Sequence, residues 1–322
     1  MNSLLAQRSP RESEGAFRRL SRWLDALPHP DLVCLIGPER VAAARWSLHR
    51  LEAFAEEPLP SGVLRPSPSQ PNVIDGAAVA AALASVVERV HGAGHEAALL
   101  LPDSIVRIFL LGFETFPRKA SEAAPLLQWR LRKSVPFPVE ETVLSWSEQR
   151  SVEGTLEVVT AVARQSVIRE YEQLLRQAGL EPGVVLGETL AALPLVADGP
   201  AVLLARLGAT SLTTAVVDGG GLALYRCVEL SAPPEPQSLL DEIFPAVAYF
   251  QDRAHRDIEL VQLAGMESYG GELMQRLARE LNCPVRALGA EASGTDHLPK
   301  GAEELLSGQL ASLVGWQLNR GA

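Results

Sequence analysis

Few side chains in this sequence have the types and spacing that chemistry would need. His91 and His95 are four residues apart, the spacing of two metal ligands on one helical turn. Two glycines lie between them and disfavour a regular helix, so we interpret the pair as part of a loop. Ser104 follows Pro102-Asp103 but lacks the Gly-x-Ser-x-Gly context of a nucleophilic serine. We find no Ser-His-Asp, Cys-His or paired-carboxylate pattern in the sequence.

The Asp-Gly-Gly-Gly stretch at residues 218–221 is the most glycine-rich in the chain. Glycine-rich loops that bind phosphate lie between a strand and a helix. Here the glycines lie between two apolar runs, at 212–217 and 222–230, which are typical of strands. The pattern therefore predicts a β-hairpin turn and not a phosphate loop.

Composition excludes several classes of protein. The chain has 322 residues, of which 47% are hydrophobic, and can bury one large core or two ordinary ones. Its net charge of −10 argues against a general affinity for nucleic acid. No uncharged apolar run reaches about 18 residues, and no signal peptide is visible, so we expect no membrane span and no secretion. Three isolated cysteines, Cys34, Cys227 and Cys283, suit a reducing cytoplasm.

The elements expected to position functional residues alternate between strands and helices. Short apolar runs bounded by turn residues predict strands at 33–36, 41–46, 98–101, 105–111, 142–149, 156–163, 202–207, 212–217, 222–230, 258–263 and 284–288. Helical periodicity predicts helices at 16–27, 77–90, 122–133, 165–178, 184–196, 238–255, 271–281 and 302–318. Five prolines predict a loop at 56–71. Hairpins early in each half imply an α/β fold of two related lobes.

The first predicted helix, at 16–27, is amphipathic. Phe17, Leu20 and Leu24 recur at helical spacing among three arginines, with Trp23 beside them. Such a helix can lie on an anionic membrane surface. Packing against the protein's own domain is the alternative interpretation.

Three blocks of the sequence resemble the PilM family of type IV pilus assembly proteins, relatives of the cell-division protein FtsA and of actin. The blocks are Pro102-Asp103-Ser104, Pro136-Phe137-Pro138, and Ala163-Arg164 followed by Ala178-Gly179-Leu180. The resemblance covers roughly residues 31–315. It implies an α/β, actin-like (ribonuclease H-like) two-lobed fold with an inserted 1C subdomain of the FtsA/PilM type.

The resemblance also implies a division of the chain. The expected segments are an N-terminal extension (1–30), lobe I (31–104), the 1C-like module (105–181), a return to lobe I (182–200), lobe II (201–300) and a C-terminal helix of lobe I (301–322).

Actin-like ATPases hold nucleotide phosphates with two hairpins, one in each lobe, that begin with Asp-x-Gly; the aspartates orient Mg²⁺ and water. The resemblance assigns these positions to Gly37 in the first loop, to Arg206, Gly208, Thr210 and Ser211 in the second, and to Gly265 at the adenosine site. Both aspartates are missing. Leu35 occupies the first position and Arg206 the second, and Met266 stands where a second adenosine-site glycine is expected.

A degenerate nucleotide site follows from these differences. We expect no hydrolysis, no catalytic residue, no metal site and no cofactor. Binding of ATP with Mg²⁺ is left open, because Arg206 could pair with a phosphate. The alternatives are an active ATPase or kinase of the actin-like superfamily and an FtsA-like, membrane-associated filament former.

The resemblance implies a cytoplasmic scaffold, peripheral at the inner membrane, in the type IV pilus assembly complex. Its expected partners are the N-terminal tail of a PilN-like single-span membrane protein and other pilus platform components. We predict that Trp129, Pro136, Phe137 and Pro138 are exposed anchors for this tail. The acidic chain favours a basic tail. The cytoplasmic domain of the type II secretion protein GspL is related, so a secretion context stays open.

Overall fold

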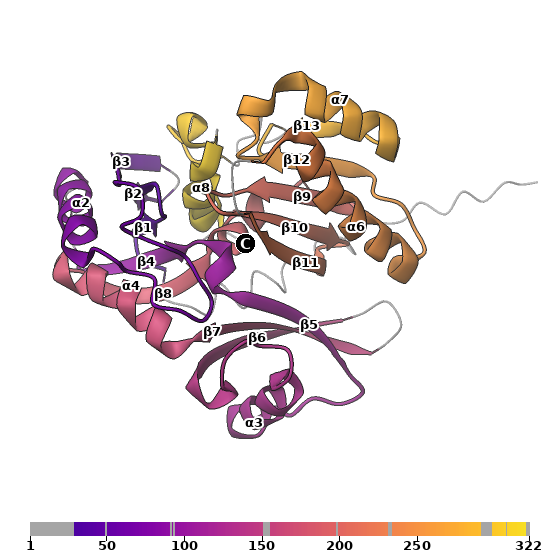
Figure 1. The fold of residues 1–322 in the computed structure, drawn as a ribbon, viewed down its shortest axis with the longest axis horizontal. Coiled ribbons are helices and arrows are strands. Elements are labelled where there is room, and N and C mark those ends of the chain that lie inside the picture. The colour runs from indigo at the N-terminus through magenta and orange to yellow at the C-terminus, as the bar shows by residue number, and fades with distance from the viewer. Residues whose placement is uncertain are drawn as a thin grey trace, which may run out of the picture.

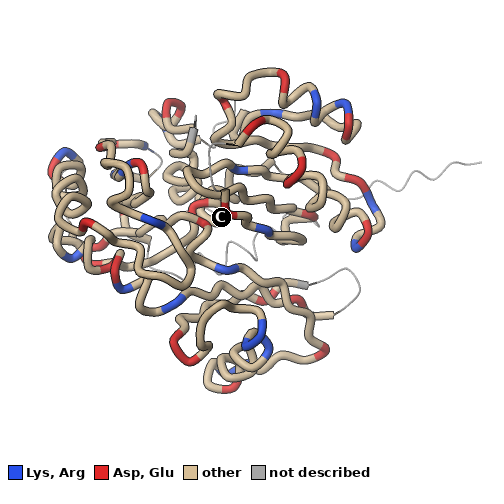
Figure 2. Tube along the Cα trace, viewed as in Figure 1, with Lys and Arg blue, Asp and Glu red and all other residues tan. Residues whose placement is uncertain are grey.

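A computed structural model describes residues 29–48, 50–90, 92, 94–150, 155–197, 199–230, 234–290, 298–306 and 308–319. It contains two five-stranded sheets and one three-stranded sheet (Figure 1). Acidic and basic residues are spread over all three parts (Figure 2). The expected helix at 16–27, with Phe17, Leu20, Trp23 and Leu24, and also His91, lie outside the described residues.

The first sheet has the strand order β3-β2-β1-β4-β8. Its strands are β1 (Leu32–Ile36), β2 (Arg40–Ser47), β3 (Arg50–Pro58), β4 (Glu96–Leu101) and β8 (Glu181–Gly187). Strands β1, β2 and β3 pair antiparallel, whereas β4 and β8 continue the sheet in parallel from β1. Helices α2 (Gly76–Arg89) and α4 (Gln165–Gln177) pack together and share a core cluster with this sheet. We call this part lobe I.

The second sheet repeats this arrangement in the order β11-β10-β9-β12-β13. Its strands are β9 (Val202–Leu207), β10 (Ser211–Asp218), β11 (Gly221–Glu229), β12 (Leu260–Ala264) and β13 (Val285–Ala287), and its helices are α6 (Pro236–Ala254) and α7 (Gly270–Leu281). The first three strands are again antiparallel and the last two parallel. The prediction of two related lobes is thus confirmed, and we call this part lobe II.

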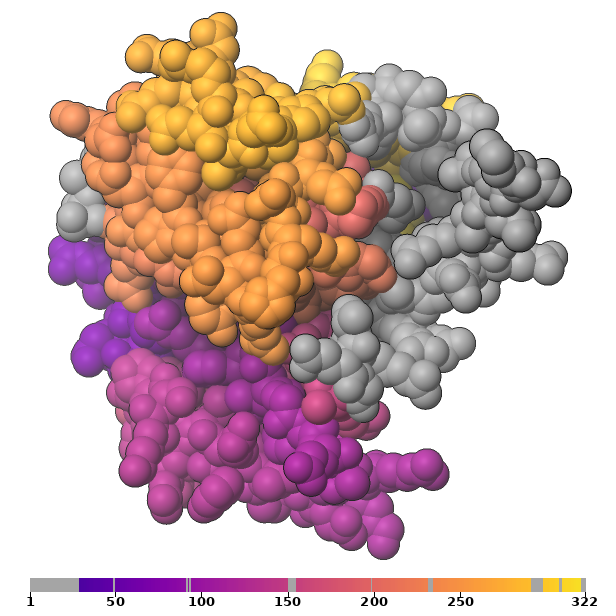
Figure 3. All heavy atoms as spheres, turned by 90° about the vertical axis from the view of Figure 1, so that its right-hand side faces the viewer, coloured from indigo at the N-terminus to yellow at the C-terminus, as the bar shows by residue number. Residues whose placement is uncertain are grey.

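The third sheet forms a small module. Strands β5 (Arg107–Phe113), β7 (Leu156–Arg164) and β6 (Thr142–Arg150) are antiparallel in that order, with α3 (Ala120–Leu131) beside them. Figure 3 shows this module, in magenta, directly against the orange lobe II. The core of α4 belongs to lobe I. Packing therefore groups α4 with lobe I, although the sequence-based division had placed residues 105–181 together.

A short helix near the C-terminus, α8 (Ala311–Leu318), packs on lobe I, where it contacts β1 and β2 (Figure 1). It packs on α5 (Glu188–Ala192), and a Cβ atom at Gly315 would collide with the carbonyl oxygen of Ala191. The indole of Trp316 donates a hydrogen bond of 3.4 Å to the carbonyl oxygen of Pro30. Short 3₁₀ turns complete the fold at 103–105, 139–141, 193–195, 267–269, 303–305 and 308–310.

The structure corrects three predicted elements. Residues 56–58 end the edge strand β3 and are not loop; Pro58 lies at its last position, where a missing N–H donor is tolerated. Residues 184–187 belong to β8 and not to a helix at 184–196, because pairing with β4 determines the structure of a short apolar run that periodicity leaves ambiguous. The last helix covers 311–318 and not 302–318.

Candidate functional site

Two hairpin turns, one from each lobe, face a common cavity between the lobes. The Gly37 turn connects β1 and β2, and the backbone N–H of Gly37 donates to the carbonyl oxygen of Arg40 over 2.9 Å. The Gly208 turn connects β9 and β10, and the backbone N–H of Gly208 donates to the carbonyl oxygen of Ser211 over 2.8 Å. The two turns thus close in the same way at equivalent places in the two sheets.

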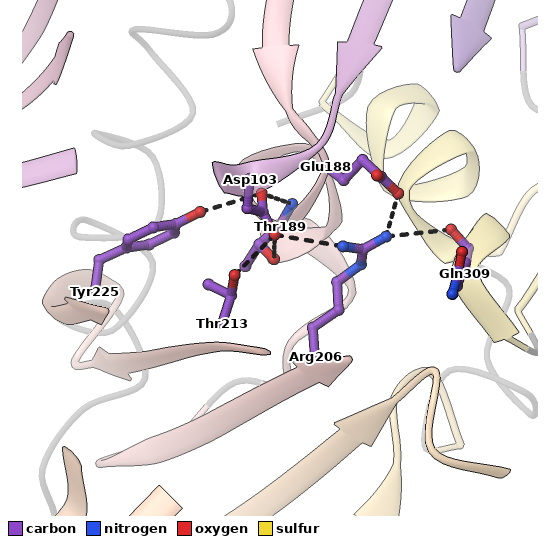
Figure 4. Close-up of polar contacts among 7 residues, drawn as sticks. All are labelled: Asp103, Glu188, Thr189, Arg206, Thr213, Tyr225 and Gln309. Atoms are coloured by element: carbon purple, nitrogen blue, oxygen red, sulfur yellow. Dashed lines mark hydrogen bonds and ion pairs between the residues drawn. The ribbon is translucent and has the colours of Figure 1, made fainter. Parts of the chain in front are cut away.

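Arg206, at the end of β9, points from lobe II toward lobe I and is fully buried (Figure 4). Its Nη1 atom lies 3.3 Å from Oδ2 of Asp103, the second residue after β4. Its Nη2 atom pairs with the carboxylate of Glu188, which begins α5 after β8, and lies 3.4 Å from the carbonyl oxygen of Gln309. We call Asp103, Glu188 and Arg206 the ion cluster.

Asp103 accepts hydrogen bonds from both lobes. In lobe I, the backbone N–H of Thr189 donates to it over 2.8 Å, and the Thr189 hydroxyl donates as well. In lobe II, the hydroxyls of Thr213 and Tyr225 donate over 2.9 Å and 3.2 Å. Hydrogen bonds to an ionised carboxylate are stronger than neutral ones. The hydrogen bonds of Asp103 and its ion pair with Arg206 therefore connect the two lobes.

The ion cluster holds one cation and two carboxylates away from water. Burial raises the pKa of Glu188 to about 7; Arg206 opposes this shift and Asp103 adds to it. Burial alone would lower the pKa of Arg206, but the carboxylates of Glu188 and Asp103 raise it. Asp103 accepts hydrogen bonds from several donors, whereas Glu188 pairs with the Arg206 guanidinium.

The cavity between the two turns is small. Gly37, Gly208, Thr210, Ser211 and Arg206 all line it, so the structure brings these five predicted residues together. Its volume is about 10 Å³, which is the space that one water molecule needs. The guanidinium of Arg206 and the side chains that it pairs with occupy the region between the turns.

Gly265, the sixth predicted residue, lies apart from this cavity. It follows β12 with a φ of +70°, and a Cβ atom there would collide with the carbonyl oxygen of Leu207. Close backbone packing and a left-handed conformation thus explain this glycine without a ligand. Met266 beside it is buried in the core of lobe II. A larger hollow of about 510 Å³, which shares Arg40 and Gln309 with the small cavity, borders Gly265, Glu56 and Glu267.

The four predicted anchor residues have different environments. The side chain of Trp129 on α3 is 64% exposed, and Pro136 and Pro138 are exposed as well. Phe137 is only 7% exposed and packs in the core of the module with Leu131 and Val162. The prediction that Phe137 is an exposed anchor is wrong, because the ring between the two prolines turns inward under α3.

Two residues of the ion cluster, Asp103 and Glu188, were not assigned to the site from sequence. Asp103 is the second residue after β4 and Glu188 the first residue after β8, and these are neighbouring parallel strands. The carboxyl ends of parallel strands are the usual place for functional side chains. That rule would have placed both residues at the cleft if β8 had been predicted as a strand.

Within the residues given above, no helix is long and apolar enough to cross a bilayer. The same residues include no group of three or more His, Cys, Asp or Glu side chains that could hold a metal ion.

Comparison with known proteins identifies the fold. No protein-family model and no curated protein matches the sequence. Among solved structures, a chain of a PilM–PilN type IV pilus biogenesis complex is similar with a TM-score of 0.71 and 20% identity, covering 92% of this chain and 100% of that one. A Bacteroides thetaiotaomicron protein, described as having an actin-like ATPase fold, is similar with a TM-score of 0.50 and 11% identity, covering 79% and 89%. The predicted actin-like, two-lobed fold is therefore confirmed.

Proposed function

We propose that this chain is a PilM-family scaffold of the type IV pilus assembly complex that binds the N-terminal tail of a PilN-like membrane protein and does not hydrolyse ATP. The likeness to a chain of the PilM–PilN complex, over 92% of the present chain and all of that one, supports this proposal. The chain would act in the cytoplasm, at the inner membrane, beside other platform components.

The ion cluster is the observation that carries the scaffold proposal. An actin-like ATPase needs carboxylates that orient Mg²⁺ and space for the phosphates between its two turns. The resemblance assigns the two carboxylate positions to Leu35 and Arg206, and the cavity between the turns measures about 10 Å³. Asp103 and Glu188 are carboxylates at the same place, but both pair with Arg206. These ion pairs join the two lobes beside the two turns and support a scaffold without ATP hydrolysis.

Exposed residues of the module are the proposed contacts for the tail. Trp129 offers a large exposed ring, and Pro136 and Pro138 are rigid exposed groups. Aromatic side chains of this kind contribute strongly to binding when a partner buries them. Phe137 would support these residues from inside the module and would not touch the partner.

Purification of the tagged full chain from detergent-solubilised membranes of its own host tests the proposal. We expect a single-span inner-membrane protein to be captured, and its synthetic N-terminal tail to bind in calorimetry with about micromolar affinity or tighter. Trp129→Ala should weaken binding about tenfold. Arg276→Ala on α7, in lobe II, is the control and should bind as wild type does. Capture of no single-span protein, or a titration without heat at several temperatures, would overturn the proposal.

A further inference from the structure

Three cavities adjoin one another along the boundary between lobe I and lobe II. The small cavity of about 10 Å³ between the Gly37 and Gly208 turns shares Arg40 and Gln309 with the hollow of about 510 Å³ described above. It shares residues of both turns with another hollow, of about 420 Å³. The two large hollows have no described lining residue in common, so the small cavity separates them.

Arg206 fills the boundary between the lobes at the small cavity (Figure 4). It comes from lobe II, whereas the two carboxylates that its guanidinium contacts, Asp103 and Glu188, belong to lobe I. All three side chains are nearly fully buried. Salt and water screen buried charges much less than exposed ones. Arg206 is therefore a strong link between the lobes at this point.

Two more exposed ion pairs connect lobe II to the module, which is inserted into lobe I between β4 and β8. Arg107 of β5 lies 3.7 Å from Glu229 of β11, and both side chains contact solvent. Arg253 of α6 pairs with Glu157 of β7 over 2.7 Å, and the Arg253 side chain is half exposed. Exposed ion pairs contribute little, because water and salt screen them. These two pairs therefore hold the lobes less firmly than Arg206 does.

An apolar core that both lobes share lies beside the ion cluster. One core cluster contains Val33 of lobe I, Ala215 of lobe II, Leu190 of α5 and Trp316 of α8. Apolar contacts are not directional, so a core of this kind tolerates a change of angle between the parts that it joins. The ion cluster lies at the edge of this core, because Glu188 is the first residue of α5. Rotation about the core would separate the guanidinium from its carboxylates.

The ion cluster does not satisfy every donor of Arg206. The two Nη atoms contact Asp103, Glu188 and the carbonyl oxygen of Gln309. The buried Nε–H has no hydrogen-bond partner among the residues that the structure describes. A buried donor without an acceptor costs free energy. This cost lowers the free energy that is needed to withdraw the guanidinium.

We propose that Arg206 is a built-in pin that keeps the two lobes closed in the absence of any ligand. Its guanidinium crosses the boundary between the lobes and holds Asp103 and Glu188 of lobe I against lobe II. Removal of the guanidinium lets the lobes rotate apart about the shared core and joins the three cavities into one cleft. The inference concerns the angle between the lobes and does not depend on the pilus proposal.

Double electron–electron resonance between spin labels on the two lobes tests the inference in the full chain. The labels are attached at Ala84→Cys on α2 and Gln275→Cys on α7, which are exposed positions. Cys227→Ser removes the half-buried native thiol, and the other two cysteines are buried. We expect one narrow distance in this background. Arg206→Ala should broaden the distribution and lengthen the distance by several ångström.

Free guanidinium ions provide a rescue experiment for Arg206→Ala. Millimolar guanidinium chloride should restore the short distance, because the ion can pair with both carboxylates as the side chain does. Sodium chloride at the same concentration should not. A second variant serves if Arg206→Ala does not fold, as judged by circular dichroism. Asp103→Asn/Glu188→Gln/Arg206→Met leaves no charge in the cluster and should also lengthen the distance.

Two other variants are matched controls. Arg226→Met/Glu242→Gln removes an ion pair of 2.7 Å that lies within lobe II, and Arg107→Met removes the exposed link to Glu229. Both should keep the wild-type distance. An unchanged distance in a folded Arg206 variant, an equal lengthening in either control, or no shortening by guanidinium would overturn the inference. No partner protein is present in these measurements, so their failure leaves the pilus proposal untouched.

Discussion

The Nη1 atom of Arg206 lies 3.3 Å from Oδ2 of Asp103, and this contact joins the end of β9 in lobe II to the turn after β4 in lobe I. The same guanidinium reaches Glu188 with its other terminal nitrogen. All three side chains are buried, so each depends on the others to offset the loss of hydration.

Replacing Arg206 by alanine should strongly destabilise the protein. The change leaves two buried carboxylates without their cation, and losing one partner of a buried pair costs about 3–5 kcal/mol. Urea unfolding followed by circular dichroism measures the effect. Arg176→Ala, which removes surface pairs with Glu172 and Glu181, should cost about 1 kcal/mol or less. Equal effects of the two substitutions would show that the ion cluster does not hold the lobes together.

Stability should depend on pH through Glu188. Burial raises the pKa of this carboxyl from 4.5 to about 7, so the folded protein binds a proton that the unfolded chain releases. Its contribution to stability is complete below about pH 4.5 and is lost as the pH rises through about 7. Relative to Glu188→Gln, the wild type should lose on the order of 3 kcal/mol of unfolding free energy between about pH 4 and pH 8. Parallel pH profiles of the two proteins would contradict the shift.

Purified protein should show no Mg²⁺-dependent release of phosphate from ATP and little thermal shift with Mg·ATP. The reason is the cavity of about 10 Å³ between the turns and the absence of carboxylates at Leu35 and Arg206. A ligand stabilises a protein only by occupying a site in the folded state. A shift of several degrees at millimolar Mg·ATP that Gly208→Val abolishes would show instead that the cleft opens to bind nucleotide.

Alanine substitutions at Gly265 and Gly219 distinguish the cost of a backbone collision from the cost of backbone strain. Both have positive φ, +70° and +54°, but only at Gly265 would a Cβ atom strike another group, the carbonyl oxygen of Leu207. Gly219→Ala should therefore cost about 1–2 kcal/mol from its conformation alone. Gly265→Ala should cost more, because β9 and the turn after β12 must also move apart. Thermal unfolding of both variants measures the difference, and a similar cost would refute the packing explanation for Gly265.

Phe137→Ala should destabilise the chain by about 3–5 kcal/mol, the usual cost of removing a buried ring. Trp129→Ala changes an exposed ring on the same module and should alter stability by no more than about 0.5 kcal/mol. Urea unfolding of the two variants checks this contrast. A neutral Phe137→Ala would mean that the ring does not contribute to the core of the module.

Elements whose structure is specified by neighbouring residues could be predicted from the sequence. The three-stranded meander β9–β10–β11 consists of apolar runs around glycine turns, so neighbouring residues specify both its strands and its pairing. Strand β8 has no such local signal. Its run at 184–187 is compatible with helix or strand, and parallel pairing with β4, about 85 residues earlier, decides between them.

The candidate site shows the same limit. Arg206 could be singled out, because it stands where a carboxylate is expected. Its partners could not, since Asp103 is 103 residues away and the contact with Glu188 requires β8 to end beside β4. Phe137 was misplaced for a related reason: flanking prolines indicate a rigid segment but not which side of that segment faces the core.

The docking of α8 determines when the molecule can finish folding. Trp316 lies in the cluster that also contains Val33 and Ala215, and its hydrogen bond to Pro30 spans 286 residues of sequence. Chains emerge from the ribosome in order, and contacts between distant residues form slowly. The apolar surface of lobe I that α8 will cover, its apolar seam, therefore stays exposed while the module and lobe II are synthesised. During translation this seam is the surface that a chaperone would have to cover.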